Sequence, residues 1–105
     1  MYFNAKICTI IVFASLVGMV AYRCGGALYT PTALDAQKEQ ISLDTLIIGR
    51  QLYIRNCGSC HSLYLPQKYT RKQWKDIVLR MKEPAKITDS QAYIIYQYLS
   101  VGAQK

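Results

Sequence analysis

The feature that most constrains this chain is the pentapeptide Cys57-Gly58-Ser59-Cys60-His61. Two cysteines separated by two residues, with a histidine directly after the second, form the attachment signature of c-type haem. In that chemistry the two thiols bond to the two vinyl groups of the porphyrin, which one turn of helix can span. The imidazole that follows binds the iron. The sequence therefore predicts one covalently bound haem c, held by Cys57, Cys60 and His61.

Two other uses of a Cys-x-x-Cys pair fit this sequence less well. A thioredoxin-like redox pair follows a strand within a βαβ pattern, and no such pattern is visible here. A structural zinc site requires four ligands at tetrahedral spacing. The chain has one histidine, and its other two cysteines, Cys8 and Cys24, lie far upstream in or beside an apolar segment. Haem attachment is therefore the preferred interpretation of the motif.

The N-terminal part of the chain differs in composition from the rest. Asn4 and Lys6 precede an apolar run without charge, from Ile7 to Tyr22, as in a signal peptide or a membrane anchor. We therefore divide the 105 residues into a signal peptide or anchor at 1–24, a linker at 25–41 and one small domain at 42–105. A domain of about 65 residues has a marginal core of its own, and a bound haem would enlarge it.

Three fates of this N-terminal segment remain open. As a helix, Ile7 to Tyr22 would be about 24 Å long, which is short for a hydrocarbon core of about 30 Å. Cys24-Gly25-Gly26 resembles a bacterial lipoprotein junction, although Arg23 stands where a small residue is expected. The segment is thus a lipid anchor at Cys24, an uncleaved helix or a cleaved leader. Each predicts export, to the periplasmic side of a bacterial membrane.

The remaining chain predicts an all-α domain of three helices. Ser42 is a plausible N-cap for a first helix that runs to Cys57. Thr70 with Gln73, and Thr88 with Gln91, form two capping boxes of the Thr-x-x-Gln type. The second helix ends at Pro84, and the third closes the chain before a fraying tail. We expect these helices to pack around the haem.

Met81 is the predicted second axial ligand of the iron. It follows Trp74, Ile77 and Val78 on one apolar face of the second helix. It is also the only methionine after the apolar segment, and the chain has no second histidine. The alternative is that Met81 is ordinary core, because methionine fills gaps well. For His61 we expect a backbone carbonyl of Leu65 or Pro66 to accept from the second ring nitrogen.

These residues together resemble the cytochrome c family, and in particular its compact single-haem, class I-like members. The resemblance covers about residues 43–101 and comprises Gly49, Leu52, Tyr53, Cys57, Gly58, Ser59, Cys60, His61, Trp74, Val78, Met81, Ile95, Tyr98 and Leu99. It implies that the first and last helices cross with Gly49 against Tyr98, and that Met81 is the distal ligand. The 19 residues between His61 and Met81 make a shorter segment than in larger members.

The resemblance implies that the chain is a carrier of single electrons and not an enzyme. No general base, nucleophile or open metal site is evident in the sequence. One alternative is a fixed haem subunit of a larger respiratory oxidoreductase. Another is a haem-based gas sensor or peroxidase-like enzyme, which would require Met81 to leave the iron or never to bind it.

The positive charge of the chain suggests the kind of partner. The formal net charge is +7, and 11 basic against 6 acidic residues remain without Lys6 and Arg23, or +5. Such a balance suits nucleic acid, an anionic membrane surface or an acidic protein, and export favours the last two. Basic residues gather around the second helix: Lys68, Arg71, Lys72, Lys75, Arg80, Lys82 and Lys86. They predict docking of an acidic redox protein; the alternative is a solvated helix face.

Overall fold

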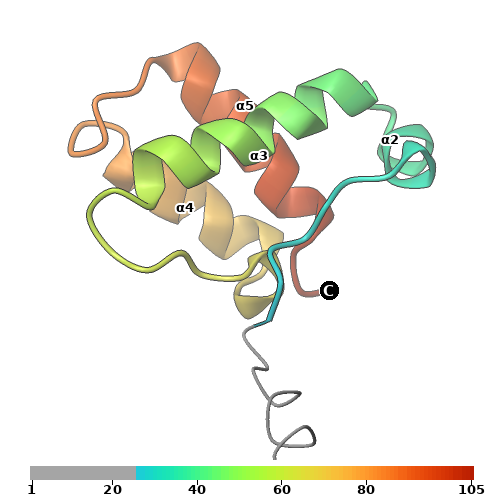
Figure 1. Ribbon diagram of the computed structural model, residues 1–105, viewed down its shortest axis with the longest axis horizontal. Helices are drawn as coiled ribbons and strands as arrows, with labels where there is room; N and C mark the ends of the chain where they lie inside the picture. Colours follow the sequence, from blue (N-terminus) through green and yellow to red (C-terminus); the bar gives the residue numbers. More distant parts are fainter. Residues whose placement is uncertain (1–25) are drawn as a thin grey trace, which may run out of the picture.

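The structure, a computed structural model, describes residues 26–105. This part of the chain is all-helical, with no strand. Its elements are α2 (Ala33–Glu39), α3 (Leu43–Cys57), the short 3₁₀ helix η2 (Pro66–Lys68), α4 (Arg71–Met81) and α5 (Asp89–Val101) (Figure 1). The three helices predicted from the sequence are α3, α4 and α5. The all-α prediction is therefore confirmed, and one further α-helix, α2, precedes them.

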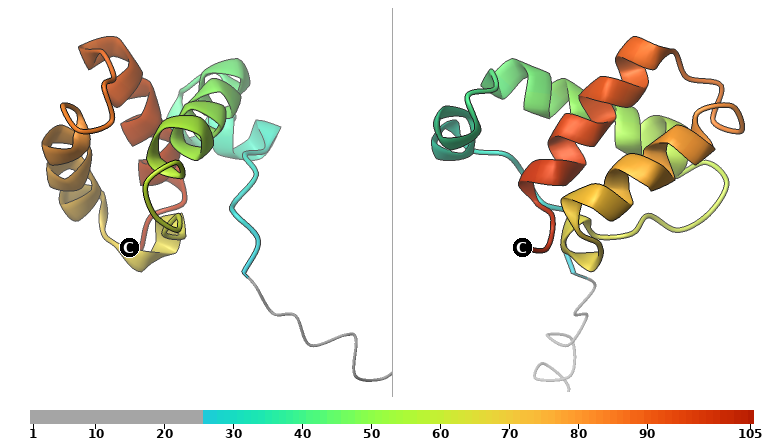
Figure 2. Two further views of the ribbon diagram at one scale, coloured as in Figure 1. Left: turned by 60° about the vertical axis from the view of Figure 1, so that its left-hand side comes forward. Right: turned by 180° about the vertical axis from the view of Figure 1, so that it is seen from behind.

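The packing of α3 on α5 is the centre of the fold. The two helices cross, and α4 lies beside α5 (Figure 2). A Cβ atom at Gly49 would lie 2.5 Å from the carbonyl oxygen of Ile94 and 2.8 Å from Cβ of Tyr98. Only a residue without a side chain allows so close an approach of the two backbones. The predicted contact of Gly49 with Tyr98 is thus present, and it explains a glycine in the middle of a helix.

Local hydrogen bonds begin each of these helices as the sequence predicts. Ser42 accepts from the backbone N–H of Thr45 at 3.1 Å. Thr70 and Thr88 each form a complete capping box with the glutamine three residues later. These caps satisfy N–H groups that have no partner inside the helix. The end of α4 differs slightly from the prediction, because the helix stops at Met81 and turns lead on to Ile87.

The core fills the space between the three larger helices. Trp74 and Val78 of α4 are buried, as are Ile95 and Leu99 of α5 and Leu52 of α3. Each helix therefore buries part or all of the apolar face that its sequence predicts. Ile77 is only half-buried and Met81 is 41% exposed, so the apolar stripe of α4 is open at its C-terminal end.

The segment predicted as a linker is structured from residue 26 onward, and we call residues 26–40 the strap. Thr32 and Asp35 form the capping box of α2, a helix with no buried residue. The carbonyl oxygen of Tyr29 accepts from Nε of Arg50 at 3.1 Å and from the hydroxyl of Tyr98 at 2.7 Å. The strap is therefore bound to both α3 and α5. Sequence periodicity missed α2 because this helix buries no apolar stripe.

The predictions for Ile7–Tyr22 and Cys24 lie outside the described residues. Within residues 26–105, no helix is both long and apolar enough to cross a bilayer.

Candidate haem site

A cavity of about 490 Å³ opens beside α4. This volume is in the range of about 300–1,000 Å³ that small-molecule and cofactor sites occupy. Its walls come from α3, from the segment between α3 and α4, from α4 and α5, and from the turn before α5. The lining residues are mostly apolar or aromatic: Tyr53, Cys57, His61, Tyr64, Tyr69, Gln73, Trp74, Asp76, Ile77, Val78, Arg80, Met81, Ile87, Ile95 and Leu99.

The predicted haem-attachment motif, Cys57 to His61, borders this cavity. Cys57 is the last residue of α3 and is half-buried, whereas Cys60 is exposed in the turn that follows. Burial, and to a lesser extent the neighbouring Cys60, raises the pKa of the Cys57 thiol above its ordinary value. Both thiols are free, so each is available to form a bond to a ligand. Cys57 and His61 line the cavity directly, and Cys60 lies outside its lining.

The orientation of His61 is set by its neighbour in the sequence. Its Nδ1 lies 2.8 Å from the carbonyl oxygen of Ser62. When Nδ1 carries the proton and donates to this oxygen, the lone pair of Nε2 is free to bind a metal. The prediction that Leu65 or Pro66 supplies this carbonyl is wrong. Pro66 accepts from Nε1 of Trp74 at 2.7 Å instead, and Leu65 from the backbone of Lys68 at 2.9 Å.

Met81 reaches the same cavity from another wall. It is the last residue of α4 and lies on the same apolar face as Trp74 and Val78. All three side chains line the cavity. Three of the four predicted site residues, Cys57, His61 and Met81, therefore converge on one apolar space. Thiol, imidazole and thioether are the groups that covalent haem attachment and axial ligation of iron require.

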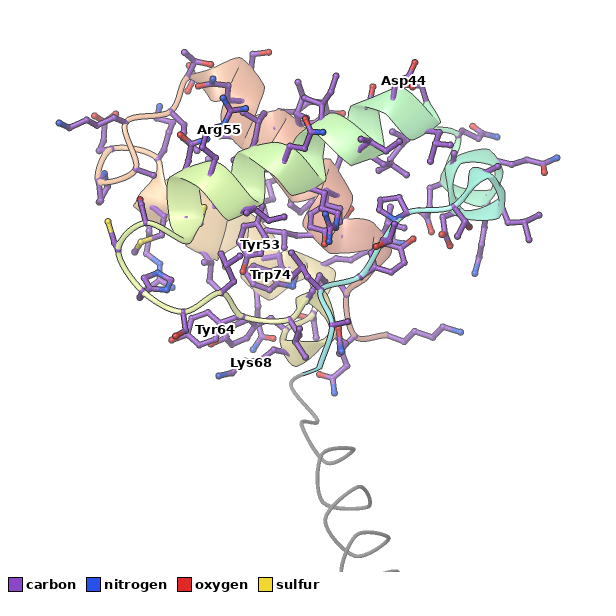
Figure 3. All side chains as sticks on the ribbon, in the orientation of Figure 1. Asp44, Tyr53, Arg55, Tyr64, Lys68 and Trp74 are labelled. Carbon is purple, nitrogen blue, oxygen red and sulfur yellow. The ribbon has the colours of Figure 1, made fainter. Side chains whose placement is uncertain are left out.

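Sequence reasoning did not assign the tyrosines of the site. Tyr53, Tyr64 and Tyr69 line the cavity, and Figure 3 shows Tyr53 and Trp74 between the helices with Tyr64 and Lys68 below them. The hydroxyl of Tyr53 donates to the carbonyl oxygen of Tyr64 at 2.8 Å, and burial raises the pKa of Tyr53. This bond ties the segment after the motif to α3. The one feature of the sequence that could have indicated their role is the high tyrosine content, nine in 105 residues.

The basic residues near α4 do not form one uniform cluster. Arg71 pairs with Glu39 of the strap and Lys82 with Asp89, each at 2.6 Å. Lys68 lies over the ring of Tyr64, with Nζ 4.1 Å from the ring centroid. Arg80 lines the cavity. The carboxylates hold the pKa of Arg71 and of Lys82 above their ordinary values, chiefly by hydrogen bonding.

Comparisons with models of protein families, with curated proteins and with solved structures found no match to this chain. Within residues 26–105, no three or more histidine, cysteine, aspartate or glutamate side chains gather as a metal-binding cluster.

Proposed function

We propose that this chain is a single-haem c-type cytochrome that carries single electrons between redox partners at the outer face of a membrane. The observation that supports it is the convergence of Cys57, His61 and Met81 on one apolar cavity. These three side chains come from the end of α3, from the turn after it and from the end of α4. A flat apolar group with a central metal needs attachment at its edge and ligands at its centre, and these residue types supply both.

Each residue of the site has a role in this proposal. Cys57 and Cys60 would hold a porphyrin through thioethers, and the imidazole of His61 and the thioether of Met81 would bind its iron. The carbonyl oxygen of Ser62 holds His61 in the tautomer that leaves Nε2 free. Trp74, Val78, Ile95 and Leu99 exclude water from the space between these ligands. When bound, the haem supplies an iron that alternates between Fe(III) and Fe(II).

The proposal extends to where the protein acts and what it meets. It is exported and held at the membrane by a lipid on Cys24 or by the uncleaved apolar segment Ile7 to Tyr22. Its partners are redox proteins with an acidic docking face, because positive charge near a cofactor steers and orients such partners. Lys72 and Lys75, on the exposed part of α4, are outside the ion pairs formed by Arg71 and Lys82.

The first experiment tests the covalent cofactor. The intact mass of purified, matured protein should exceed that of the processed polypeptide by one haem, and acidified organic solvent should not extract the chromophore. Changing Cys57 and Cys60 together to alanine should remove both properties. A matured wild-type protein without the added mass would reject the proposal.

The second experiment tests the axial ligand. The oxidised protein should show the weak near-infrared band of methionine-ligated low-spin iron, and Met81→Ala should abolish that band, lower the potential and allow carbon monoxide to bind. Leu79→Ala is the matched control, because Leu79 lies on the same helix, is 59% exposed and does not line the cavity. If Met81→Ala keeps the band and the potential, Met81 is core and not a ligand.

The third experiment tests the partner. The Debye length falls from about 30 Å at 0.01 M salt to about 8 Å at 0.15 M, so electron transfer to an acidic partner should slow steeply over that range. Changing Lys72 and Lys75 together to glutamate should slow it at low salt, whereas Lys38→Glu on the strap should not. If the rate of electron transfer responds neither to salt nor to the change of Lys72 and Lys75, the protein is a permanently assembled subunit.

A further inference from the structure

An unbroken row of aromatic rings runs from the cavity to the strap. Seven rings follow one another, and each contacts the next at a centroid distance between 5.0 and 6.1 Å. In order they are His61, Tyr64, Tyr69, Trp74, Tyr53, Tyr98 and Tyr29. These distances lie within the range of direct aromatic contact, about 4.5–7 Å. The row thus joins the candidate haem site to the N-terminal side of the domain through ring contacts alone.

The two ends of the row have different surroundings. His61, Tyr64 and Tyr69 line the cavity at one end, and Tyr64 is 41% exposed. At the other end Tyr29 lies outside the cavity lining, on the strap, and stacks on Tyr98 with a centroid distance of 6.0 Å. Tyr53 and Tyr98, between them, are almost fully buried. Only the ends can therefore meet solvent or a soluble oxidant.

The choice of aromatic residues is not what packing alone requires. Residues 26–105 contain seven tyrosines, one tryptophan and no phenylalanine. Phenylalanine would fill the same core positions without a polar atom that needs a partner. Tyrosine and tryptophan differ from phenylalanine in a second way, because they lose one electron at potentials that biological oxidants reach. Every ring between His61 and Tyr29 in this row is a tyrosine or a tryptophan, and so can be oxidised by one electron.

The proton of each tyrosine decides where an oxidising equivalent can rest, because a tyrosine that loses an electron also loses its phenolic proton. The hydroxyls of Tyr53 and Tyr98 donate to backbone carbonyls, at 2.8 and 2.7 Å, and a carbonyl is a poor base. The hydroxyl of Tyr29 is buried without a well-formed hydrogen bond. Burial, and then the neighbouring carboxylate of Asp35, raises the pKa of Tyr29. Hydrogen bonds from Thr32 to its Oδ2 lower the pKa of Asp35, so this carboxylate is ionised and can receive that proton.

We propose that this row of rings is a relay that moves one-electron oxidising equivalents from the cavity to Tyr29. Its oxidant is a peroxide that reacts in the cavity in those molecules whose iron Met81 has released, and for this reacting group the inference rests on the proposed function. Hydrogen peroxide takes up two electrons and two protons and becomes two molecules of water. Two tyrosines, Tyr29 and Tyr64, each supply one electron and one proton. The proton of Tyr29 passes to solvent by way of Asp35, that of the exposed Tyr64 passes to solvent directly, and the peroxide takes up its two protons from solvent.

The relay protects the most vulnerable ligand of the site. Met81 lines the cavity and is 41% exposed, and oxidation would convert its thioether to a polar sulfoxide. An oxidising equivalent that moves along the rings to Tyr29 leaves Met81 unmodified. Breaking the relay should therefore have two effects at opposite ends of the molecule: less radical at Tyr29 and more sulfoxide at Met81.

The test maps radical positions in the full-length, matured protein after addition of hydrogen peroxide. A nitroso spin trap captures tyrosyl radicals, and peptide mass mapping locates the adducts and the sulfoxide. Tyr53→Phe interrupts the relay at its middle, because Tyr53 is the ring that joins Trp74 to Tyr98. Tyr93→Phe is the control, since Tyr93 is 62% exposed and belongs to none of the ring contacts.

We expect adducts at Tyr29 in the wild type and in Tyr93→Phe, and a several-fold loss of them in Tyr53→Phe with a matching rise in Met81 sulfoxide. Circular dichroism of each variant establishes that the helices are intact, so a folding defect is recognised. Tyr29 adducts that are absent in the wild type, or equally abundant in Tyr53→Phe, would overturn the relay.

A second oxidant separates failure of the relay from failure of the proposed function. Photogenerated tris(bipyridine)ruthenium(III) oxidises the exposed Tyr64 without any haem, taking one electron while the phenolic proton passes to solvent. If the protein lacks the mass of a haem but this reagent still gives Tyr29 adducts that depend on Tyr53, the relay stands and the proposed function fails. If the haem is present and neither oxidant gives such adducts, the relay fails and the proposed function stands.

Discussion

The contact between α3 and α5 and the wall formed by α4 are built in opposite ways. At Gly49 the backbones of α3 and α5 approach until no side-chain atom fits between them, and Leu46, Tyr98 and Leu99 on these helices have no exposed surface. The wall of α4 instead faces a cavity of about 490 Å³, with Ile77 half-buried and Met81 41% exposed. One region is closed by its own backbone and side chains, whereas the other presents apolar side chains to a cavity.

This difference assigns separate tasks to the two regions. A close-packed contact is sensitive to added volume, because native interiors have few voids. An apolar wall that faces a cavity has fewer such contacts, and its side chains decide which ligand fits the cavity. We therefore expect α3 and α5 to determine whether the domain folds. The wall of α4 should determine what the domain binds.

The largest expected effect comes from filling the close contact. Gly49→Val adds a side chain whose Cβ would lie 2.5 Å from the carbonyl oxygen of Ile94, and the helices must separate. We expect the free energy of unfolding to fall by about 3 kcal/mol, measured by urea denaturation. Gln51→Val, on the exposed side of the same helix, controls for the β-branched side chain. Equal losses for the two variants would show that the contact is looser than described.

A smaller loss is expected at the base of the α4 wall. Trp74→Phe removes the N–H that donates to the carbonyl oxygen of Pro66 at 2.7 Å, and that acceptor is left inside the protein without its partner. The free energy of unfolding should fall by about 2 kcal/mol in the same assay. Tyr96→Phe is the control, because it removes one polar atom from a half-buried ring outside the cavity lining. It should change the free energy of unfolding by less than about 0.5 kcal/mol.

The capping boxes of α4 and α5 provide a matched pair, because the same motif begins a helix of each region. Thr70→Ala and Thr88→Ala should each cost about 1 kcal/mol. Amide hydrogen exchange should separate them, since regions with fewer buried contacts open on their own. We expect Thr70→Ala to speed exchange in α4 alone and Thr88→Ala to speed it in both α3 and α5. Identical exchange patterns would mean that the two regions unfold together.

The smallest expected effect concerns the ion pair that joins the strap to α4. The hydrogen bond from Arg71, at 2.6 Å, lowers the pKa of Glu39. A carboxyl whose pKa is lowered by folding stabilises the folded state at pH values above its unfolded pKa, about 4.3. This stabilisation is lost as the pH falls through the pKa of the folded state. Glu39→Gln should therefore cost a few tenths of a kcal/mol at pH 7 and less near pH 3.

Thermal unfolding at both pH values measures this difference. Glu83→Gln is the control, because Glu83 is 89% exposed and lies 3.9 Å from its nearest partner, Lys82. A cost for Glu39→Gln that is equally large at low pH would indicate a role for this side chain other than its charge.

Local sequence was sufficient for the features that depend on neighbours along the chain. The capping boxes at Thr70 and Thr88 each use a side chain and a backbone three residues apart, so their residues identify them. The sequence likewise determines that Cys57 and His61 lie near each other, because they are four positions apart in the chain. The apolar stripe of α4 placed Met81 on the face that lines the cavity, because helical periodicity alone determines which side chains share a face.

The tertiary structure decided whatever depends on residues far apart in the chain. The strap is held by Tyr98, 69 residues from Tyr29, and no pattern within residues 26–40 reveals that bond. The carbonyl of Pro66 was a suitable partner for His61 by sequence distance, yet the folding of α4 brings Trp74 to it instead. The row of aromatic rings arises in the same way, from three helices and two connecting segments. Sequence specifies local geometry through short-range bonds, whereas packing selects among distant partners by shape, and shape exists only once the helices have come together.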